Sequence, residues 1–338
     1  MSGKVAFCVV SWNNAAVLPV CLDSLLAQTG VDFDIYLMDN GSTDETRSVM
    51  ARYPGVRVTW SDTNHGFARG NNLLIKQALA DPDVAYVALI NSDAALDPAW
   101  AATLVAFAER HGRVGSLQGL TLDYYDHDVV DSAHIFVNKY LQGTQFGYGD
   151  SAEGVFYPRR VFGVNAAAAM YTRAMIEGLP DRKHDFFDER FFMYYEDVDV
   201  AYRALLAGWT AWFVPDAVAY HMGSFSAHRL GSNFSLRMTA RNLPAMVFKN
   251  TPWPVLRRNF RPAWQQMMLF IEQAGVRHGP EVGRQTRRAF WRGLLRLPIY
   301  AASRRRIAAA RVLDSNYLAR IMRNDGIPGA MDDPTAIP

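Results

Sequence analysis

The sequence predicts an α/β fold, in which helices cover both faces of a mostly parallel sheet, followed by a helical C-terminal region. Strand-like apolar runs alternate with helical patterns over residues 1–110, and this alternation is typical of parallel sheets. Short polar motifs directly follow three of these runs, where such sheets bind ligands. After about residue 235 the composition shifts to Arg, Trp, Phe, Leu and Ala, so we divide the chain into 1–235 and 236–338.

The elements follow from the spacing of apolar residues. Short runs rich in Val, Ile and aromatic residues predict strands, and apolar residues that recur every three to four positions predict helices. The predicted strands are 5–10, 34–39, 56–60 and 84–90, and the helices between them are 15–28, 43–53 and 67–80. Residues 115–165 are less regular and predict mixed strands with a long loop. Further along, the pattern predicts a helix at 196–207, a strand at 210–214 and a loop around His221.

Composition narrows the class of protein. Half of the residues are hydrophobic and 20% are charged, which predicts a packed core. Cys8 and Cys21 stand in apolar surroundings, so we expect buried thiols and neither a disulfide nor a metal site. No run approaches the ~18 consecutive apolar residues of a membrane span. The first strand leads straight into a polar loop, unlike a signal peptide, and we therefore expect a cytoplasmic protein.

Two polar segments are candidates for binding a nucleotide. Asp39 ends the second predicted strand, and its carboxylate can accept hydrogen bonds from a pyrimidine N–H or a ribose; a βα turn with a capping aspartate is the alternative. Residues 64–72 combine glycines, amides and Arg69 at a predicted helix start. Backbone N–H groups and a guanidinium there can bind an anion. The chain contains neither a G-x-G-x-x-G fingerprint in this segment nor a Walker A motif.

Asn91-Ser92-Asp93 follows the fourth predicted strand and is a candidate cation site. Mg²⁺ and Mn²⁺ prefer carboxylate and phosphate oxygens, and a cation here could bridge the two phosphates of a nucleotide. An Asx turn is the structural alternative. His221 stands alone in the sequence, and a lone histidine is more often structural than a metal ligand.

Glu196-Asp197 follows an aromatic run and begins a predicted helix. The helix dipole favours negative charge at this end, so we expect both carboxylates to stay ionised. An ionised carboxylate there can take the proton from an attacking hydroxyl. Ordinary acidic residues at a helix N-terminus are the alternative.

Taken in order, the motifs resemble family 2 glycosyltransferases of the GT-A fold, especially the bacterial rhamnosyltransferase-type members that build surface polysaccharides. The sequences that carry the resemblance are V-S-W-N-N, D-N-G-S-T-D, N-x-G-F-A-x-G-N-N, N-S-D-A, E-D-V-D and Tyr220-His221-Met222-Gly223. The resemblance covers residues 4–226 and implies an inverting transferase that takes a sugar from a dTDP- or UDP-sugar donor. L-rhamnose is the first candidate for this sugar. The implied acceptor is a hydroxyl of a glycan or of a polyprenyl-diphosphate-linked sugar, and we expect residues 120–165 to face it.

The resemblance also implies residue roles. Asp197 matches the catalytic base, and Asp93 matches the metal-binding aspartate of the D-x-D motif, whose first aspartate is replaced here by Asn91. His221 matches the histidine that completes the coordination of Mg²⁺ or Mn²⁺. Glu196 and Tyr195 would lie on the acceptor side. The expected donor-binding residues are Ser11, Asn13, Asp39, Asn64, Gly66, Arg69, Asn71, Asn91 and Ser92.

Alternatives remain open at this point. A nucleotidyltransferase or a catalytically inactive glycan-binding module could share the predicted sheet, although the usual phosphate loop of the former is missing. The tail carries Arg284, Arg288, Arg292 and Arg296 on one helical stripe beside Trp and Leu residues. This stripe predicts peripheral contact with the inner membrane surface, or packing on the first region of the chain, or a homo-oligomer interface. We expect no nucleic-acid partner, because the basic residues form no recognisable binding motif.

Overall fold

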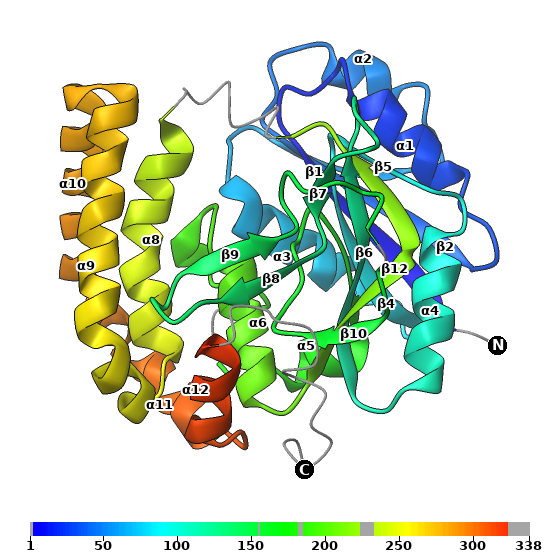
Figure 1. Cartoon of the computed structure of the whole chain (residues 1–338). Coiled ribbons are helices and arrows are strands. Elements are labelled where there is room, and N and C mark those ends of the chain that lie inside the picture. Colours follow the sequence, from blue (N-terminus) through cyan, green and yellow to red (C-terminus); the bar gives the residue numbers. More distant parts are fainter. Residues whose placement is uncertain (1–2, 155, 182–184, 224–232, 324–338) are drawn as a thin grey trace.

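The computed structural model describes residues 3–154, 156–181, 185–223 and 233–323. A ten-stranded sheet forms its centre, and eight strands run in the order β10-β12-β6-β11-β4-β1-β2-β3, with β5 paired to β12 and β7 paired to β6 (Figure 1). A separate two-stranded sheet joins β8 to β9. The bounds of the strands are β1 Lys4–Ser11, β2 Phe33–Asn40, β3 Arg57–Ser61, β4 Val84–Asn91, β5 Ala94–Leu96, β6 Val114–Asp123, β7 Val130–Ser132, β8 His134–Val137, β9 Gly143–Phe146, β10 Arg159–Val161, β11 Ala168–Thr172 and β12 Thr210–His221.

Most of the long strands run in one direction. Strands β3, β2, β1 and β4 are parallel neighbours, and β6 and β12 are parallel to each other. Strand β11 lies antiparallel between β4 and β6, so these two strands also share a direction. The C-terminal residues Ser11, Asn40, Asn91 and His221 therefore come to the same edge of the sheet, as expected for ligand-binding α/β sheets.

Helices cover both faces of the sheet, as the sequence predicts. The helices α1 Leu18–Leu26, α2 Thr46–Met50 and α4 Trp100–Arg110 contribute to the core on one face. The helices α3 Gly66–Ala78, α5 Arg173–Gly178 and α6 Glu196–Leu206 contribute to the core on the other face. Cys8 and Cys21 are free and buried, which confirms the prediction made for both thiols.

Strand β12 differs from the prediction of a short strand followed by a loop. It continues to His221, which pairs with Asp123 of β6 on one side and with Ala94 of β5 on the other. The register with β6 shifts between Phe213 and Val218, around a proline that has no N–H to donate. Pairing resumes after this irregularity, and His221 is thereby fixed at the end of a central strand.

The C-terminal region is helical, as predicted. Its helices are α8 Phe234–Asn250, α9 Trp253–His278, α10 Pro280–Leu295, η3 Leu297–Tyr300, α11 Ala301–Ala309 and α12 Ser315–Arg323. Helix α8 stands between the sheet and the outer pair α9 and α10 (Figure 1). A third core joins these helices to α6 and β8, so the region is packed against the sheet domain. Among the described residues, no helix has the length and apolar character to span a membrane.

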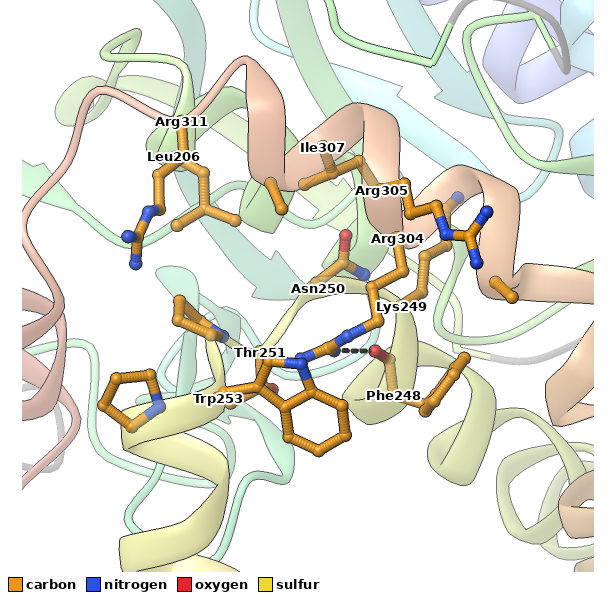
Figure 2. Close-up of a pocket in the computed structure, with 14 residues that line it drawn as sticks. Leu206, Phe248, Lys249, Asn250, Thr251, Trp253, Arg304, Arg305, Ile307 and Arg311 are labelled. Carbon is orange, nitrogen blue, oxygen red and sulfur yellow. Dashed lines mark hydrogen bonds between the residues drawn. The ribbon is translucent and has the colours of Figure 1, made fainter.

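A cavity of about 380 Å³ lies where α8 ends, α9 begins and α11 passes (Figure 2). Because its lining residues belong to the end of α6 and to the helical region, we call it the second cavity. A larger cavity lies at the C-terminal edge of the sheet.

Candidate active site

The larger cavity, here called the central cavity, has a volume of about 670 Å³. It opens where β1, β2, β4 and β12 end, and α6 and α8 close it on another side. Eight of the residues expected from the sequence line it: Asn64, Asn91, Ser92, Asp93, Tyr195, Glu196, Asp197 and His221. The fold thus brings four distant stretches of the chain to one place.

Asp93 faces His221 across the end of the sheet. It lies in the turn between β4 and β5, where Oδ1 is 3.4 Å from Nε2 of His221. On the other side of the imidazole ring, Nδ1 lies 3.2 Å from Oδ2 of Asp131 in β7. Burial alone would lower the pKa of His221, but hydrogen bonds to Asp131 and Asp93 outweigh it and raise the pKa to about 10.

This arrangement is one that metal-ligating histidines adopt. A second carboxylate on the far ring nitrogen fixes the ring and increases the basicity of the ligating nitrogen. Asp131 occupies that position behind His221, and Asn91 Nδ2 lies 3.3 Å from the Nε2 that faces the cavity. In the described part of the chain, no cluster of three His, Cys, Asp or Glu side chains forms a complete metal site.

Glu196 and Asp197 occupy the first turn of α6 and line the opposite part of the cavity. Burial raises the pKa of Asp197 to about 6, although N–H groups of Val198 and Ala166 oppose the shift. Burial, with the charge of Asp197 added, raises the pKa of Glu196 well above its usual range. The expectation that the helix dipole keeps both carboxylates ionised is wrong for Glu196, because loss of solvation outweighs the dipole.

The loop before α6 has an unusual backbone. Phe192, Tyr194 and Tyr195 adopt left-handed φ values of 68°, 68° and 73°. Side chains with a Cβ pay roughly 1–2 kcal/mol each for this conformation, so other contacts must stabilise the loop. Asn242 of α8 supplies them, since its Nδ2 lies 3.0, 2.9 and 2.8 Å from the carbonyl oxygens of Phe191, Met193 and Tyr194.

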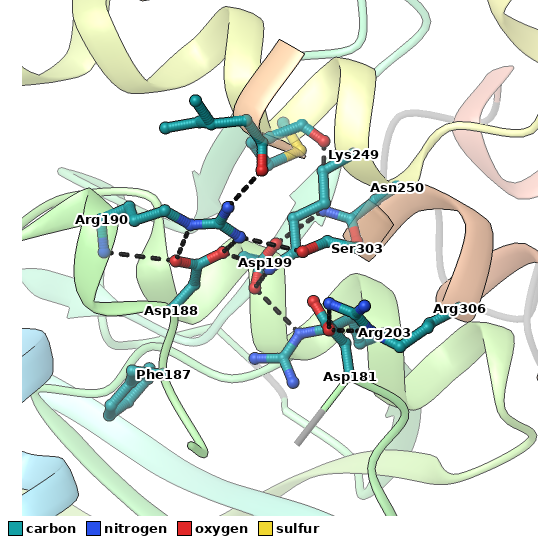
Figure 3. A network of polar contacts seen from close by, with 12 residues as sticks. Asp181, Phe187, Asp188, Arg190, Asp199, Arg203, Lys249, Asn250, Ser303 and Arg306 are labelled. Carbon is teal, nitrogen blue, oxygen red and sulfur yellow. Dashed lines mark hydrogen bonds and ion pairs between the residues drawn. The ribbon is translucent and has the colours of Figure 1, made fainter. Parts of the chain in front are cut away.

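A buried ionic network fixes the other side of α6 (Figure 3). Lys249 of α8 lies 2.8 Å from Asp188 and 2.9 Å from Asp199, and all three side chains are about 1% exposed or less. Asp199 also accepts hydrogen bonds from Arg203 at 2.9 Å and from Asn250 at 2.8 Å. Arg190 and Lys249 lower the pKa of Asp188 below its usual range, against the effect of burial.

The expected nucleoside residues form a group beside the central cavity, outside its lining. Ser11 and Asp39 are register partners at the ends of β1 and β2. Asn13 Oδ1 accepts a hydrogen bond from the N–H of Thr43 at 2.7 Å, which links the two strand ends. Ser11 Oγ and Asp39 Oδ1 are buried without a hydrogen-bond partner, whereas Trp12 and Asn40 next to them line the cavity.

Three further expected residues are not brought to the cavity lining. Arg69 is exposed on α3, and Asn71 is buried, with Nδ2 donating to the carbonyl of Phe67 in its own helix. Gly66 has φ +77°, and an added Cβ would come within 2.5 Å of Phe192. The N–H groups expected to bind an anion are used internally, because those of Gly66 and Ala68 donate to Asn64 Oδ1 and Phe192 O.

Sequence reasoning missed several residues of the site. Asp131 lies in a stretch with many aspartates, and only the pairing of β7 with β6 reveals its place beside His221. Thr239 of α8 lines the cavity, and Asn242 holds the loop before α6, so the helical region completes the site. The amide of Asn242 gave no signal in the sequence, because its partners are backbone carbonyls almost fifty residues away.

The fold and the cavity define a glycosyltransferase of the GT-A fold. The chain belongs to glycosyl transferase family 2, whose model matches residues 6–178, just over half of its length. It is 29% identical over 273 residues to an N-acetylglucosaminyl-diphospho-decaprenol L-rhamnosyltransferase of Mycobacterium tuberculosis. The aligned region covers 73% of this chain and 84% of that relative. A PGL/p-HBAD biosynthesis glycosyltransferase of Mycobacterium bovis is 60% identical over 37 residues, which are 11% of this chain and 14% of that protein.

Solved structures show the same fold. A mannosyltransferase from Pyrobaculum calidifontis, in complex with GDP-Man and Mn²⁺, has a TM-score of 0.52 and 15% identity over 92% of this chain and 86% of its own. TarS from S. aureus, in complex with UDP-GlcNAc, has a TM-score of 0.52 and 16% identity over 95% and 87% of the two chains. The comparisons thus favour the glycosyltransferase over the nucleotidyltransferase considered from the sequence.

Proposed function

We propose that this enzyme transfers a sugar from a nucleoside diphosphate to a hydroxyl of a lipid-linked glycan, with Asp197 as the general base. One observation carries the proposal: Asp197 and the Asp93–His221 pair line the same cavity from different elements. A cavity of about 670 Å³ is of the size that holds a nucleotide-sugar together with the end of an acceptor.

The chemistry is a single displacement at the anomeric carbon. Asp197 takes the proton of the acceptor hydroxyl while its oxygen bonds to the sugar, and the bond between the sugar and the diphosphate breaks. General-base assistance of this kind contributes roughly 10²–10⁴-fold in rate, and it works best when the pKa of the base lies near the working pH. A pKa of about 6 for Asp197 meets this condition. No covalent sugar-enzyme intermediate is required, which is the basis for an inverting mechanism.

A divalent cation, Mg²⁺ or Mn²⁺, would be held by Asp93 and His221. The donor set fits, because a carboxylate oxygen and an imidazole nitrogen 3.4 Å apart can bind one ion, and Asp131 supports the imidazole from behind. The remaining positions would fall to phosphate oxygens and water, as is common for such ions. When bound, the ion supplies positive charge to the departing diphosphate.

The donor is proposed to be a dTDP- or UDP-sugar, with L-rhamnose as the sugar to be transferred. Ser11, Asn13 and Asp39 would hold the nucleoside, because Asp39 Oδ1 and Ser11 Oγ are buried polar atoms that lack a partner. The relative named as an L-rhamnosyltransferase, which acts on N-acetylglucosaminyl-diphospho-decaprenol, supports both rhamnose and a polyprenyl-diphosphate-linked acceptor. Tyr195 and Glu196 would contact the acceptor.

A donor panel tests the proposal. The protein is heated with dTDP-rhamnose or with individual UDP-hexoses, with and without Mn²⁺, and the donor should raise the Tm by mass action only when the ion is present. Turnover should then release a nucleoside diphosphate. Release of pyrophosphate, or donor binding without any transfer or hydrolysis, would contradict the proposed activity.

We also propose that the outer helices contact an anionic membrane surface on the cytoplasmic side. Trp291 and Leu295 of α10 are 49% and 81% exposed, and Phe260 of α9 is 58% exposed. Arg288 and Arg292 are exposed on the same helix α10, which suits anionic lipid headgroups. Flotation with anionic vesicles should recover the wild type and lose the L295S/W291S variant. If both remain in solution and the wild type self-associates, an oligomer interface replaces this proposal.

A further inference from the structure

The second cavity is separate from the proposed active site. It shares no lining residue with the central cavity, and it lies by Leu206, the last residue of α6, whereas Asp197 lies in the first turn of that helix. Eleven helical residues span about 15 Å, so a ligand here does not reach the reacting atoms. Its volume of about 380 Å³ suits a small ligand.

Positive charge dominates this cavity. Among the described residues, its lining includes Lys249, Arg304, Arg305 and Arg311 and no Asp or Glu side chain. The charge of Lys249 is neutralised by Asp188 and Asp199. The three arginines keep theirs, because no carboxylate of the described residues lies within ion-pair distance of them.

The three arginines differ in exposure and in position around the cavity (Figure 2). Arg304 is half-buried and stacks on Trp253, with its guanidinium carbon 4.3 Å from the centroid of the indole ring. It also donates to the carbonyl of Phe248, so its position is fixed. Arg305 is exposed on α11, and Arg311 is exposed and bonds to the hydroxyl of Ser315. Arg305 and Arg311 lie on opposite sides of the cavity in Figure 2, so each can contact a different part of one ligand.

The N-terminus of α9 points to the same chemistry. This helix has 26 residues, begins at Trp253, and receives no hydrogen bond from a capping side chain. Its first residues, Trp253 and Pro254, line the cavity. The partial positive charge of an uncapped helix end attracts phosphate and carboxylate groups.

An unsatisfied acceptor in the cavity wall adds a second requirement. Asn250 is 3% exposed and lines the cavity, and its Oδ1 has no hydrogen-bond partner. The orientation of the amide is fixed, because Nδ2 donates to Asp199 at 2.8 Å and to the carbonyl of Met246 at 3.1 Å. Oδ1 therefore needs a donor such as a hydroxyl group, which an anion without an O–H, such as sulfate, lacks.

From these features we propose that the second cavity binds a phosphate carried on a hydroxylated ring, such as a sugar phosphate. The phosphate lies between Arg311 and the start of α9, Arg305 faces the ring from the other side of the cavity, and a ring hydroxyl donates to Asn250. The source of this group is either a soluble sugar phosphate or the headgroup of a lipid.

The test uses the full chain with its central cavity saturated by dTDP and Mn²⁺. Glucose 1-phosphate and sulfate are titrated by calorimetry into the wild type, into the Arg305→Gln and Arg311→Gln variants, and into Arg110→Gln, which changes an exposed arginine of α4, as a matched control. Each cavity variant should weaken the binding of glucose 1-phosphate about tenfold, because a charge-assisted hydrogen bond is lost. The control should bind as the wild type does.

The outcomes separate the parts of the proposal. No binding of glucose 1-phosphate, or equal affinities in the wild type and both cavity variants, would overturn it. Equal affinities for sulfate and glucose 1-phosphate would remove the contact with Asn250 and overturn the assignment of a hydroxylated ring.

Vesicles identify the source of the group. Phosphatidylcholine vesicles with and without phosphatidylinositol, whose headgroup is a hydroxylated ring on a phosphate, are sedimented with each variant. Recovery that requires phosphatidylinositol, Arg305 and Arg311 supports a lipid headgroup. Binding of glucose 1-phosphate without such recovery supports a soluble ligand.

Discussion

Asp93 and Asp197 reach the central cavity from two regions that are built on different principles. Asp93 lies in a short turn at the edge of the sheet, and its carboxylate faces Nε2 of His221. Asp197 lies in the first turn of a helix that follows a loop with left-handed residues, and its neighbour in sequence is another buried carboxyl group, Glu196. One carboxylate thus shares a proposed cation site with an imidazole nitrogen, and the other is buried in a poorly solvated wall.

The difference follows from what each carboxylate has to do. A cation ligand must be ionised, and a fixed positive partner or metal favours that state. A general base must bind a proton for part of the reaction, and burial brings its pKa close to neutral pH. The sheet holds Asp93 by itself, whereas the position of Asp197 depends on α8 through Asn242 and Lys249.

Removing the proposed base should have the largest effect. We expect Asp197→Asn to reduce kcat by about 10²–10⁴-fold, because the amide cannot accept the proton, while the affinity for dTDP with Mn²⁺ stays unchanged. The matched control is Asp62→Asn, which changes an exposed aspartate outside the cavity lining. If donor affinity fell as much as kcat, Asp197 would be a donor ligand and the assigned role would be wrong.

The same substitution should increase stability in a pH-dependent way. Because burial raises the pKa of Asp197 from 3.8 to about 6, the folded state binds this proton more tightly than the unfolded state does. The cost of the ionised form is fully present above pH 6 and vanishes as the pH falls below 3.8. At pH 8 the free energy of unfolding of Asp197→Asn should therefore exceed that of the wild type by roughly 1–3 kcal/mol, and its Tm should be higher. Near pH 3.5 the two proteins should unfold at the same Tm. A constant difference across this range would show that the pKa is not raised.

The sequence predicted the first of the two regions better than the second. Strands 1, 2 and 4 and the motif around Asp93 depend on local patterns, in which apolar runs end at polar residues. The pair Glu196-Asp197 was found by its motif, but its raised pKa depends on burial by elements that are distant in sequence. Asp131 and Asn242 were missed for the same reason, since their roles come from tertiary contacts.

Breaking the buried ionic network should destabilise the second region most. Lys249→Met leaves Asp188 and Asp199 without their shared cation, and removal of one partner from a buried pair typically costs about 3–5 kcal/mol. Urea unfolding of this variant and of Lys76→Met, which changes an exposed lysine on α3, measures the effect. The control should match the wild type. A Lys249→Met loss below about 1 kcal/mol would mean that the network adds little to the stability of the chain.

Removing the charge of Asp131, which contacts His221, should weaken the binding of Mn²⁺. Asp131→Asn keeps the shape of the side chain but removes the charge behind the ring, and we expect the Mn²⁺ concentration for half-maximal activity to rise about 10–100-fold. Asp128→Asn, an exposed aspartate nearby in sequence, serves as the control. The maximal rate at saturating Mn²⁺ should change little, because the base lies elsewhere. An unchanged requirement for Mn²⁺ would indicate that His221 is not a ligand of the cation.

The smallest effect is expected from the loop contact made by α8. Asn242→Leu removes the amide that binds the carbonyl oxygens of Phe191, Met193 and Tyr194, so the loop that positions Asp197 should become less ordered. We expect kcat to fall about tenfold with an unchanged affinity for dTDP, since misplacement of a catalytic group affects the reaction more than the binding of the donor. Asn259→Leu, which removes an asparagine of α9 bonded only within its own helix, is the control. Because Arg241 still donates to Phe191, part of the loop should stay in place, and a loss as large as that of Asp197→Asn would indicate unfolding of the whole segment.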